Sequence, residues 1–354
     1  MKKEIKEKPE KENKVDQTRE NVLYLGIDLG TSRAAIAADN GVRQVVPTYV
    51  GYPRDEISTD LLKKDIVFGQ EALDHRLSLE VIRPLEHGVI KHDENGKSVK
   101  AVQELLRYLL SLVETQPGQQ VEGVIGTPAR ASITDQKILI EAAGEILRAV
   151  MVCSEPFSVA YGFGILDNVM VVDIGAGTVD ICCIHGTLPQ EHEQITLDKA
   201  GDYVDEYLSQ LIKEAYPEAQ FTINMLRNLK ERYGFVSEES DRVICIFPVE
   251  GKPTEFDITN QLREACSSIV PGIVQATAKL VAGYDPEFQQ KLRDNVLLAG
   301  GGSQMIGLPD LLEKGMGKVG GGKVKRVDEP VFAGANGALK LAKRMPEHYW
   351  QVFR

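Results

Sequence analysis

Two short stretches that share one pattern constrain the fold of this chain more than any other feature. The first, "LGIDLGTSRAAI", spans Leu25–Ile36, and the second, "VVDIGAGTVDIC", spans Val171–Cys182. In each, an apolar run typical of a buried strand reaches an aspartate, passes through glycine and small residues, and resumes as a second strand. Strands and helices alternate after both stretches. The sequence therefore predicts two related α/β lobes, each opened by an aspartate-containing hairpin, with a ligand between them.

The turns of these hairpins are suited to binding phosphate. Glycine lets backbone N–H groups approach an anion without an intervening Cβ, and successive N–H groups form a concave anion site. A carboxylate that faces a polyphosphate is repelled unless a cation lies between them, so Asp28 and Asp173 predict a hydrated Mg²⁺. Asp180 is a weaker candidate, because the outgoing strand can turn it toward solvent. The candidate phosphate-binding residues are Gly30, Thr31, Ser32, Arg33, Gly175, Ala176, Gly177 and Thr178.

Two well-known phosphate-binding patterns do not fit these turns. No G-K-[ST] segment opens a helix, as a Walker loop requires, and a strand follows each turn where a dinucleotide-binding fold has a helix. For either hairpin alone, an ordinary turn remains the alternative. A third glycine cluster, Gly300, Gly301, Gly302 and Ser303, follows the apolar strand "NVLLA", a position suited to a nucleoside; a connector is its alternative. Gly320–Gly322 lies in a polar stretch and is predicted to be a plain loop.

Hydrophobic periodicity predicts the remaining elements. A small peripheral lobe is expected over Pro47–Gly69, and Pro271 should kink or split the helical stretch that contains it. A strand is expected over Val121–Ala129. Helices are expected over Ser98–Glu114, Ser132–Val150, Ala200–Tyr216, Ile258–Tyr284, Met305–Met316 and Ala333–Met345. Another helix is expected within Thr222–Val236 and should stop near Gly234.

Composition narrows the class of protein. A chain of 354 residues suits two lobes, and its net charge of -11 opposes binding to nucleic acid and to anionic membranes. We find no apolar run long enough to span a bilayer and no signal-type segment, which predicts a cytoplasmic protein. The five cysteines lack C-x-x-C spacing and are expected to be buried, reduced thiols. Met1–Asn21, rich in lysine and glutamate, is predicted to be a disordered tail, with a helix of Glu/Lys pairs as the alternative.

Five motifs resemble, in order, those of the actin, sugar-kinase and chaperone ATPase superfamily. They are "IDLGTS", "SEPFSVAYG", "VDIGAGTVD", "LLAGGGS" and "GANGALKLA", and they cover Leu25–Ala342. Within the superfamily, "RPLEHGVI", "VIGTPARAS" and "KAGDYVDEYL" are similar to bacterial actins, magnetosome filament proteins among them. The resemblance implies an α/β, actin-like two-lobed ATPase fold of duplicated ribonuclease-H-like domains with two small peripheral subdomains. The predicted boundaries are 22–53, 94–165 and 335–354 for subdomain IA, 54–93 for IB, 166–201 and 255–334 for IIA, and 202–254 for IIB, after the tail at 1–21.

The resemblance also implies roles for individual residues. Glu155 matches the glutamate that orients the hydrolytic water, and Thr178 lies on the side of the terminal phosphate. Asp28 and Asp173 match the metal-associated aspartates. From the residues alone, a glutamate before a proline at a strand end can reach a cleft and align water, but a helix-start carboxylate favoured by the helix dipole is its alternative.

Lys230 and Glu231 of "RNLKERYG" resemble the residues of the helix that reaches the nucleoside, although a solvated pair on an exposed helix face is equally consistent with the residues. The implied cofactors are ATP or ADP with Mg²⁺, and the implied activity is a slow ATPase coupled to filament turnover. The implied partners are further copies of the chain, stacked head to tail, and magnetosome-associated proteins. Nucleic acid and direct membrane insertion are not expected.

A metabolite kinase and a chaperone-type ATPase are the alternatives to a filament-forming ATPase within the superfamily. A metabolite kinase would need a further carboxylate as a base toward a substrate hydroxyl, and the sequence offers no obvious candidate. A chaperone-type switch would need a β-rich substrate domain, for which the residues after the last motif leave no room. The sequence does not decide between ATP and GTP.

Overall fold

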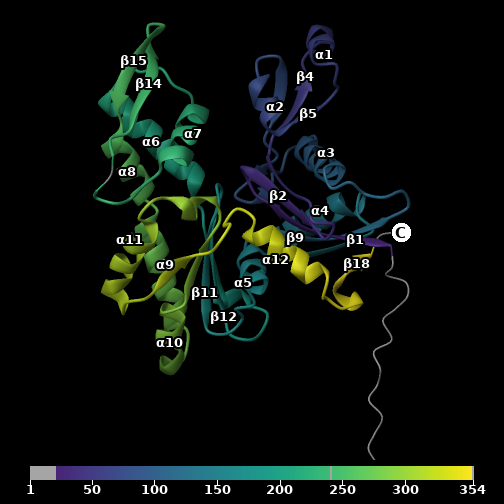
Figure 1. Cartoon of the computed structure of the whole chain (residues 1–354), viewed down its shortest axis with the longest axis vertical. Helices are drawn as coiled ribbons and strands as arrows, with labels where there is room; N and C mark the ends of the chain where they lie inside the picture. Colours follow the sequence, from purple (N-terminus) through teal and green to yellow (C-terminus); the bar gives the residue numbers. More distant parts are fainter. Residues whose placement is uncertain (1–20, 240, 353–354) are drawn as a thin grey trace, which may run out of the picture.

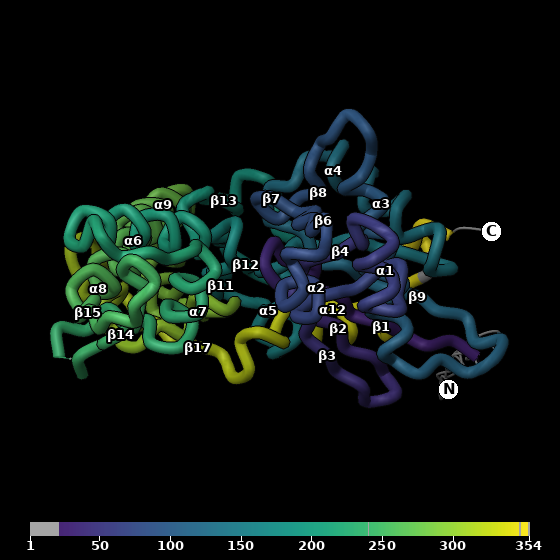
Figure 2. The backbone as a smooth tube through the Cα atoms, turned by 90° about the horizontal axis from the view of Figure 1, so that it is seen from above, coloured from purple at the N-terminus to yellow at the C-terminus, as the bar shows by residue number. Residues whose placement is uncertain are grey.

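A computed structural model describes residues 21–239 and 241–352. Apart from Asn21, the predicted tail lies outside the described residues. The chain forms two lobes, one in the purple and blue part of the sequence and one in the green and olive part, and they stand side by side when seen from above (Figures 1 and 2). Each lobe is built around one large β-sheet, as the paired hairpins predict.

The sheet of the first lobe has six strands in the order β18-β10-β9-β1-β2-β3. β1 pairs with β2 in antiparallel register, Asp28 opposite Ala35, and with β9 in parallel register, Asp28 opposite Gly126. β1, β2 and β9 are largely buried on both faces, which fits their apolar runs. The strands are β1 (Val22–Leu29), β2 (Arg33–Ala38), β3 (Arg43–Pro47), β9 (Gln120–Thr127), β10 (Ala149–Ser154) and β18 (Gln351–Val352).

The sheet of the second lobe repeats this arrangement with five strands in the order β13-β12-β11-β16-β17. β11 pairs with β12 in antiparallel register and with β16 in parallel register, as β1 does with β2 and β9. The duplicated order confirms the predicted actin-like two-lobed fold. The strands are β11 (Val169–Ile174), β12 (Val179–Ile184), β13 (Gln194–Leu197), β16 (Val296–Ala299) and β17 (Val324–Arg326).

Two helices join the lobes. α5 (Glu155–Phe163) packs on strands of both sheets, and α12 (Ala333–Ala342) lies beside it against the first sheet (Figure 1). The helices cross closely: a Cβ built on Gly162 would stand 3.0 Å from the Cα of Gly337. Their apolar faces share one core cluster with β9, β10, β11 and β12, in which Phe157 and Leu341 are buried.

Smaller units extend from each lobe on the same side of the molecule (Figure 1). The first unit holds β4 (Val50–Pro53), β5 (Val67–Phe68) and β6 (Leu79–Ile82) with α1 (Glu56–Leu62) and α2 (Gly69–Asp74), and the second holds the hairpin of β14 (Ile244–Val249) and β15 (Lys252–Asp257). β4 pairs with β5 and β6, so residues 50–53 lie in the peripheral sheet although the predicted boundary assigns them to IA. The predicted boundary at 254/255 likewise divides β15.

The remaining elements complete the two lobes. The short strands β7 (Leu85–Glu86) and β8 (Val89–Ile90) and the helices α3 (Lys97–Ser111) and α4 (Ile133–Gly144) belong to the first lobe. The second lobe holds α6 (Gly201–Ala215), α7 (Ile223–Tyr233), α10 (Pro286–Arg293) and α11 (Leu308–Met316). The helix predicted over Ser132–Val150 is too long, because Ala149 and Val150 pair with β9 as the start of β10. Ser132 caps α4 by accepting a hydrogen bond from the Asp135 backbone N–H.

The stretch around Pro271 is divided, as predicted, into α8 (Thr259–Ser267) and α9 (Val270–Ala282), with Pro271 in the first turn of α9. Contrary to our expectation, Thr259–Ala282 is long and apolar enough, by length and composition, to cross a membrane. Its apolar side chains, among them Leu262 and Ile273, pack in the core of the second lobe. All five cysteines are free thiols, four of them buried and Cys153 partly exposed.

Candidate functional site

The two aspartate-containing hairpins meet at one cavity between the lobes, with a volume of about 320 Å³. It combines both phosphate hairpins, the start of α5, the last turn of α7 and the glycine loop after β16. The predicted residues that line it are Asp28, Gly30, Thr31, Ser32, Arg33, Glu155, Asp173, Gly175, Ala176, Gly177, Thr178, Lys230, Glu231, Gly300, Gly301 and Gly302. Segments far apart in the sequence thus converge where the duplicated fold predicts a ligand.

Asp28 and Asp173 reach this cavity from equivalent positions. Each is the next-to-last residue of its strand, β1 or β11, and each precedes the turn of its hairpin. Because β1 and β11 hold the same place in their sheets, the duplicated topology directs both carboxylates to the same edge of the fold.

The carboxylates of the cavity repel one another. Burial raises the pKa of Asp28 to about 6, and burial followed by the charges of neighbouring carboxylates raises the pKa of Asp173 and of Glu155 well above the usual range. Among the described residues, no cation offsets the charge on Asp28 or Asp173. A divalent cation would relieve this repulsion, and a few carboxylate oxygens supplemented by water and phosphate suit Mg²⁺. The donor set fits the ion.

Residues 21–239 and 241–352 hold no group of three or more His, Cys, Asp or Glu side chains placed to bind a metal by themselves. Mg²⁺ differs from zinc in this respect, because it keeps several waters and takes few protein ligands.

Glu155 is the first residue of α5 and follows β10 directly, so the strand end fixes its position on the cavity. Pro156, at the first turn of the helix, favours a helix start at this point. The side chain also lies close to Gly126, where a Cβ would stand 3.1 Å from Glu155 Cγ. The predicted position of a carboxylate at the cleft therefore matches the geometry.

The sequence left open that Asp180 faces solvent from the outgoing strand, but its side chain is buried. It does not line the cavity either. It is 1% exposed and accepts hydrogen bonds from the backbone N–H of Ala129, at 2.8 Å, and from Thr196 Oγ1, at 2.6 Å. Ala129 follows β9 in the first lobe, and Asp180 lies on β12 in the second. This carboxylate therefore connects the lobes.

The glycine loop after β16 lies close to the second hairpin. Gly300 has a φ of 75°, and a Cβ there would clash with the Ile174 carbonyl and with Asp173 Oδ1. The prediction that Ser303 lines the nucleoside site is wrong in this structure. Its side chain is fully buried and donates a hydrogen bond to the Gly300 carbonyl at 2.7 Å. Ser303 therefore stabilises the glycine loop and does not face the cavity.

Lys230 and Glu231 are not a free solvated pair. Lys230 Nζ donates to the Gly201 carbonyl at 2.6 Å and pairs with Asp205 Oδ1 at 2.6 Å. Glu231 forms an ion pair with Arg33, which joins α7 of the second lobe to β2 of the first. Both residues line the cavity, but their charges are already engaged within the protein.

Sequence reasoning missed several lining residues. Gly88 N–H donates to Thr31 Oγ1 at 2.8 Å, and Gly201 begins α6 beside the second hairpin. Isolated glycines in "LEHG" and "KAGD" gave the only local signal for these two. The missed residues that line the cavity are Ala35, Gly88, Gly201, Gly234, Gln304, Met305 and Val331.

The duplicated sheets and the cavity between them define an actin-like protein. The profile of the MreB/Mbl protein family matches residues 23–349, and the chain belongs to this family. Its relatives include the actin-like protein MamK of Paramagnetospirillum magneticum, 38% identical over 94% of this chain and 95% of that protein. MamK of Magnetospirillum gryphiswaldense is 36% identical over 98% of this chain and 96% of that protein.

Solved structures of MamK are similar to this one in fold. A MamK double helical filament has a TM-score of 0.89 at 37% identity, covering 92% of this chain and all of that chain. A non-polymerising MamK mutant bound to AMPPNP has a TM-score of 0.70 at the same identity, covering 92% of this chain and 99% of that one. By TM-score, the structure is more similar to the filament subunit than to the non-polymerising mutant.

Proposed function

We propose that this protein is an actin-like ATPase that binds Mg²⁺-ATP between its lobes, polymerises head to tail, and disassembles after hydrolysis. One observation carries the proposal. Two matched hairpins meet at one cavity, together with the carboxylates of Asp28, Asp173 and Glu155, whose charges are not balanced by a cation among the described residues. Anion-binding turns beside repelling carboxylates form a site for a polyphosphate together with a divalent cation.

Each residue has a role in this proposal. The backbone N–H groups of the hairpin turns bind the phosphates, with Thr178 at the terminal one. Asp28 and Asp173 would hold Mg²⁺, which when bound neutralises phosphate charge. Glu155 accepts a hydrogen bond from the attacking water and aligns it.

The nucleoside is proposed to lie against the glycine loop. Gly300, Gly301 and Gly302 let a flat base or ribose approach the backbone after β16. Lys230 and Glu231, fixed by Asp205 and Arg33, contact the other side of the nucleoside. We retain the predicted four-subdomain division as part of this proposal, with β4 counted in IB and β15 in IIB.

Polymerisation is supported by the relatives and by the similarity to a filament subunit. MamK forms a double helical filament, and this chain resembles that subunit more than the non-polymerising mutant. A head-to-tail contact that does not close into a ring extends into an open filament. We further propose a cytoplasmic filament that positions magnetosomes through magnetosome-associated partners, because both relatives compared above are named MamK.

The test is sedimentation followed by electron microscopy of the purified full-length protein with ATP, GTP, ADP or AMPPNP, each with Mg²⁺ or with a chelator. We expect filaments with Mg²⁺-ATP that shorten as phosphate is released, and persistent filaments with AMPPNP. A protein that remains in the supernatant under every condition contradicts the proposal and favours a kinase of the same superfamily.

A further inference from the structure

A continuous set of contacts crosses from one lobe to the other and joins the two phosphate hairpins. Arg83, which follows β6 in the first lobe, donates from Nε to the Thr31 carbonyl at 3.0 Å. Its Nη2 pairs with Asp202 Oδ2 at 2.8 Å. The Asp202 backbone N–H donates to the Ala176 carbonyl at 2.7 Å. Arg83 and Asp202 therefore connect Thr31 of one turn to Ala176 of the other.

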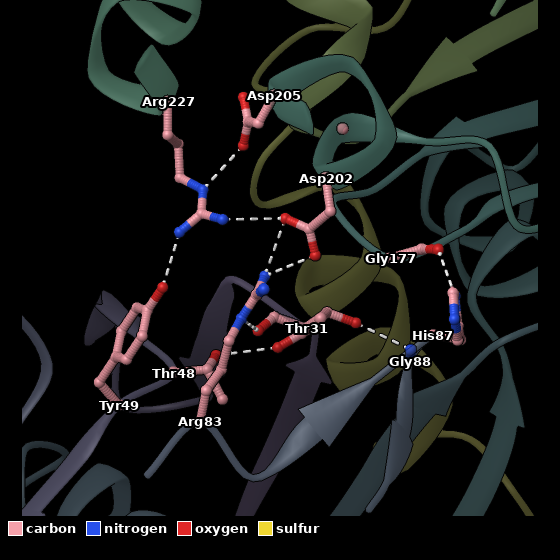
Figure 3. Close-up of polar contacts among 12 residues, drawn as sticks. Thr31, Thr48, Tyr49, Arg83, His87, Gly88, Gly177, Asp202, Asp205 and Arg227 are labelled. Carbon is pink, nitrogen blue, oxygen red and sulfur yellow. Dashed lines mark hydrogen bonds and ion pairs between the residues drawn. The ribbon is translucent and has the colours of Figure 1, made fainter. Parts of the chain in front are cut away.

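A second arm runs parallel to the first. Arg227 of α7 pairs with Asp202 at 3.1 Å and with Asp205 at 3.0 Å, and it donates to the Tyr49 hydroxyl at 2.7 Å. Thr48, beside Tyr49, donates to the Gly30 carbonyl at 2.8 Å. Asp202 lies between the two guanidinium groups (Figure 3). Both arms end on the backbone of the first hairpin.

We propose that Arg83 is a positioning residue that fixes the separation of the two phosphate hairpins through Asp202. Its planar fork serves two acceptors at once, the Thr31 carbonyl and the Asp202 carboxylate, which a lysine ammonium on a flexible stem does not reproduce. The pair is substantially withdrawn from solvent, with side-chain exposures of 21% for Arg83 and 26% for Asp202, so salt screens it less than a surface pair. The inference rests on the proposed nucleotide site, because the spacing of the hairpins matters only if both bind one ligand.

The first test measures the spacing of the lobes without nucleotide. Small-angle scattering of the monomeric full-length protein is compared for wild type, Arg83→Ala, Arg83→Lys and the matched control Arg43→Ala. The Arg43 side chain also forms a fork with a carboxylate, that of Glu329, but it contacts neither phosphate-binding turn. We expect a larger radius of gyration for Arg83→Ala, a smaller increase for Arg83→Lys and none for Arg43→Ala. An unchanged radius in Arg83→Ala overturns the proposal.

The second test measures affinity for AMPPNP with Mg²⁺, which separates binding from turnover. We expect Arg83→Ala to weaken binding about tenfold. Asp202→Asn should weaken it at least as much, because it removes the ion pair with Arg227 as well as the one with Arg83, and the double variant should be no weaker than Asp202→Asn alone. An affinity within about twofold of wild type, or additive losses, overturns the proposal. If Arg83→Ala fails to fold by circular dichroism, Arg83→Lys decides the first test and Asp202→Asn decides the second.

The two tests also separate this inference from the proposed function. A wild-type protein that binds AMPPNP without forming filaments contradicts polymerisation. The ratio of each variant's AMPPNP affinity to that of wild type then still tests the role of Arg83. A wild-type protein that binds no nucleotide contradicts the proposed function and removes the site that Arg83 is said to position, so it overturns both. The radius of gyration is measured without ligand and shows independently whether Arg83 holds the lobes.

Discussion

Asp28 and Asp173 are 145 positions apart in the sequence, yet they line the same cavity. Each is the next-to-last residue of the strand that starts its hairpin. The relationship follows from the duplicated strand order, which gives β1 and β11 the same neighbours. Two like charges are thereby brought to one buried site, where each raises the cost of ionising the other. Such an arrangement stabilises a bound cation and destabilises the empty protein.

Replacing either aspartate by asparagine should therefore separate stability from binding. We expect Asp28→Asn and Asp173→Asn to raise the free energy of unfolding of the nucleotide-free protein at pH 7 by about 1–3 kcal/mol, because a buried repelling charge is removed. Both should weaken Mg²⁺-dependent AMPPNP binding by about tenfold or more. Urea unfolding and calorimetric titration with and without Mg²⁺ measure the two effects. A loss of stability in both variants would contradict this account.

The pH dependence of binding should follow Asp28. Burial raises its pKa from 3.8 to about 6. As pH rises between these values, the unfolded chain ionises while the folded protein keeps its proton, so this contribution to the stability of the empty protein is lost as pH increases. Mg²⁺ requires the ionised carboxylate, so Mg²⁺-dependent nucleotide affinity should instead increase as pH rises through about 6. Titration between about pH 5 and pH 7.5 tests this, with Asp28→Asn expected to show a flatter profile.

Substitution of Glu155 should slow hydrolysis while leaving assembly intact. Without a carboxylate to align the water, we expect Glu155→Ala and Glu155→Gln to lower phosphate release about 10²–10⁴-fold, with filaments that persist after ATP is added. Phosphate release and sedimentation are measured together. Glu145→Gln, at an exposed carboxylate of the first lobe, is the control. Rapid disassembly of Glu155→Ala filaments would exclude the role proposed for this residue.

Neighbouring glycines of the loop after β16 should respond differently to alanine. Gly300 has positive φ and no room for a Cβ, whereas nothing lies within 4 Å of a Cβ built on Gly301. Gly300→Ala should therefore lower the free energy of unfolding by about 1–3 kcal/mol, and Gly301→Ala should change it by less than about 0.5 kcal/mol. Urea unfolding of the nucleotide-free protein measures both. Equal losses at the two positions would show that the loop is not constrained as described.

The close crossing of α5 and α12 gives a further pair of variants. A Cβ on Gly337 would overlap the Ser158 carbonyl, while one on Gly317 would meet no atom within 4 Å. Gly337→Ala should lower the free energy of unfolding by about 1–3 kcal/mol through overpacking, and Gly317→Ala should leave it nearly unchanged. Thermal unfolding followed by circular dichroism provides the comparison. If Gly337→Ala is as stable as wild type, the helices are not in the contact described.

Local pattern was sufficient to predict the hairpins and their aspartates, because strand, turn and strand are contiguous in sequence. It was also sufficient for the break at Pro271, since a proline acts on its own backbone. Local pattern failed where pairing across the sheet decides the outcome. Ala149 and Val150 continue a helical pattern, but they form a strand because β9 lies beside them.

The bridges between lobes could not be predicted from the sequence. Arg83 contacts Asp202, and Asp180 contacts Ala129, across separations that no periodicity records. Ser303 shows the opposite error, because its place in a glycine cluster suggested a ligand, while its hydroxyl serves the loop itself. Residue type and spacing identified the chemistry of the site, but only the fold shows which polar groups are already occupied.

The meeting of Gly162 with Gly337 has a consequence for how the molecule can move. At this crossing the two backbones touch directly, because neither glycine carries a side chain to hold the helices apart. Any change in the angle between these helices must therefore keep this close backbone contact. The polar contacts between the lobes, Arg83–Asp202, Arg33–Glu231 and Asp180–Ala129 among them, restrain the two halves at points that this helix crossing does not reach.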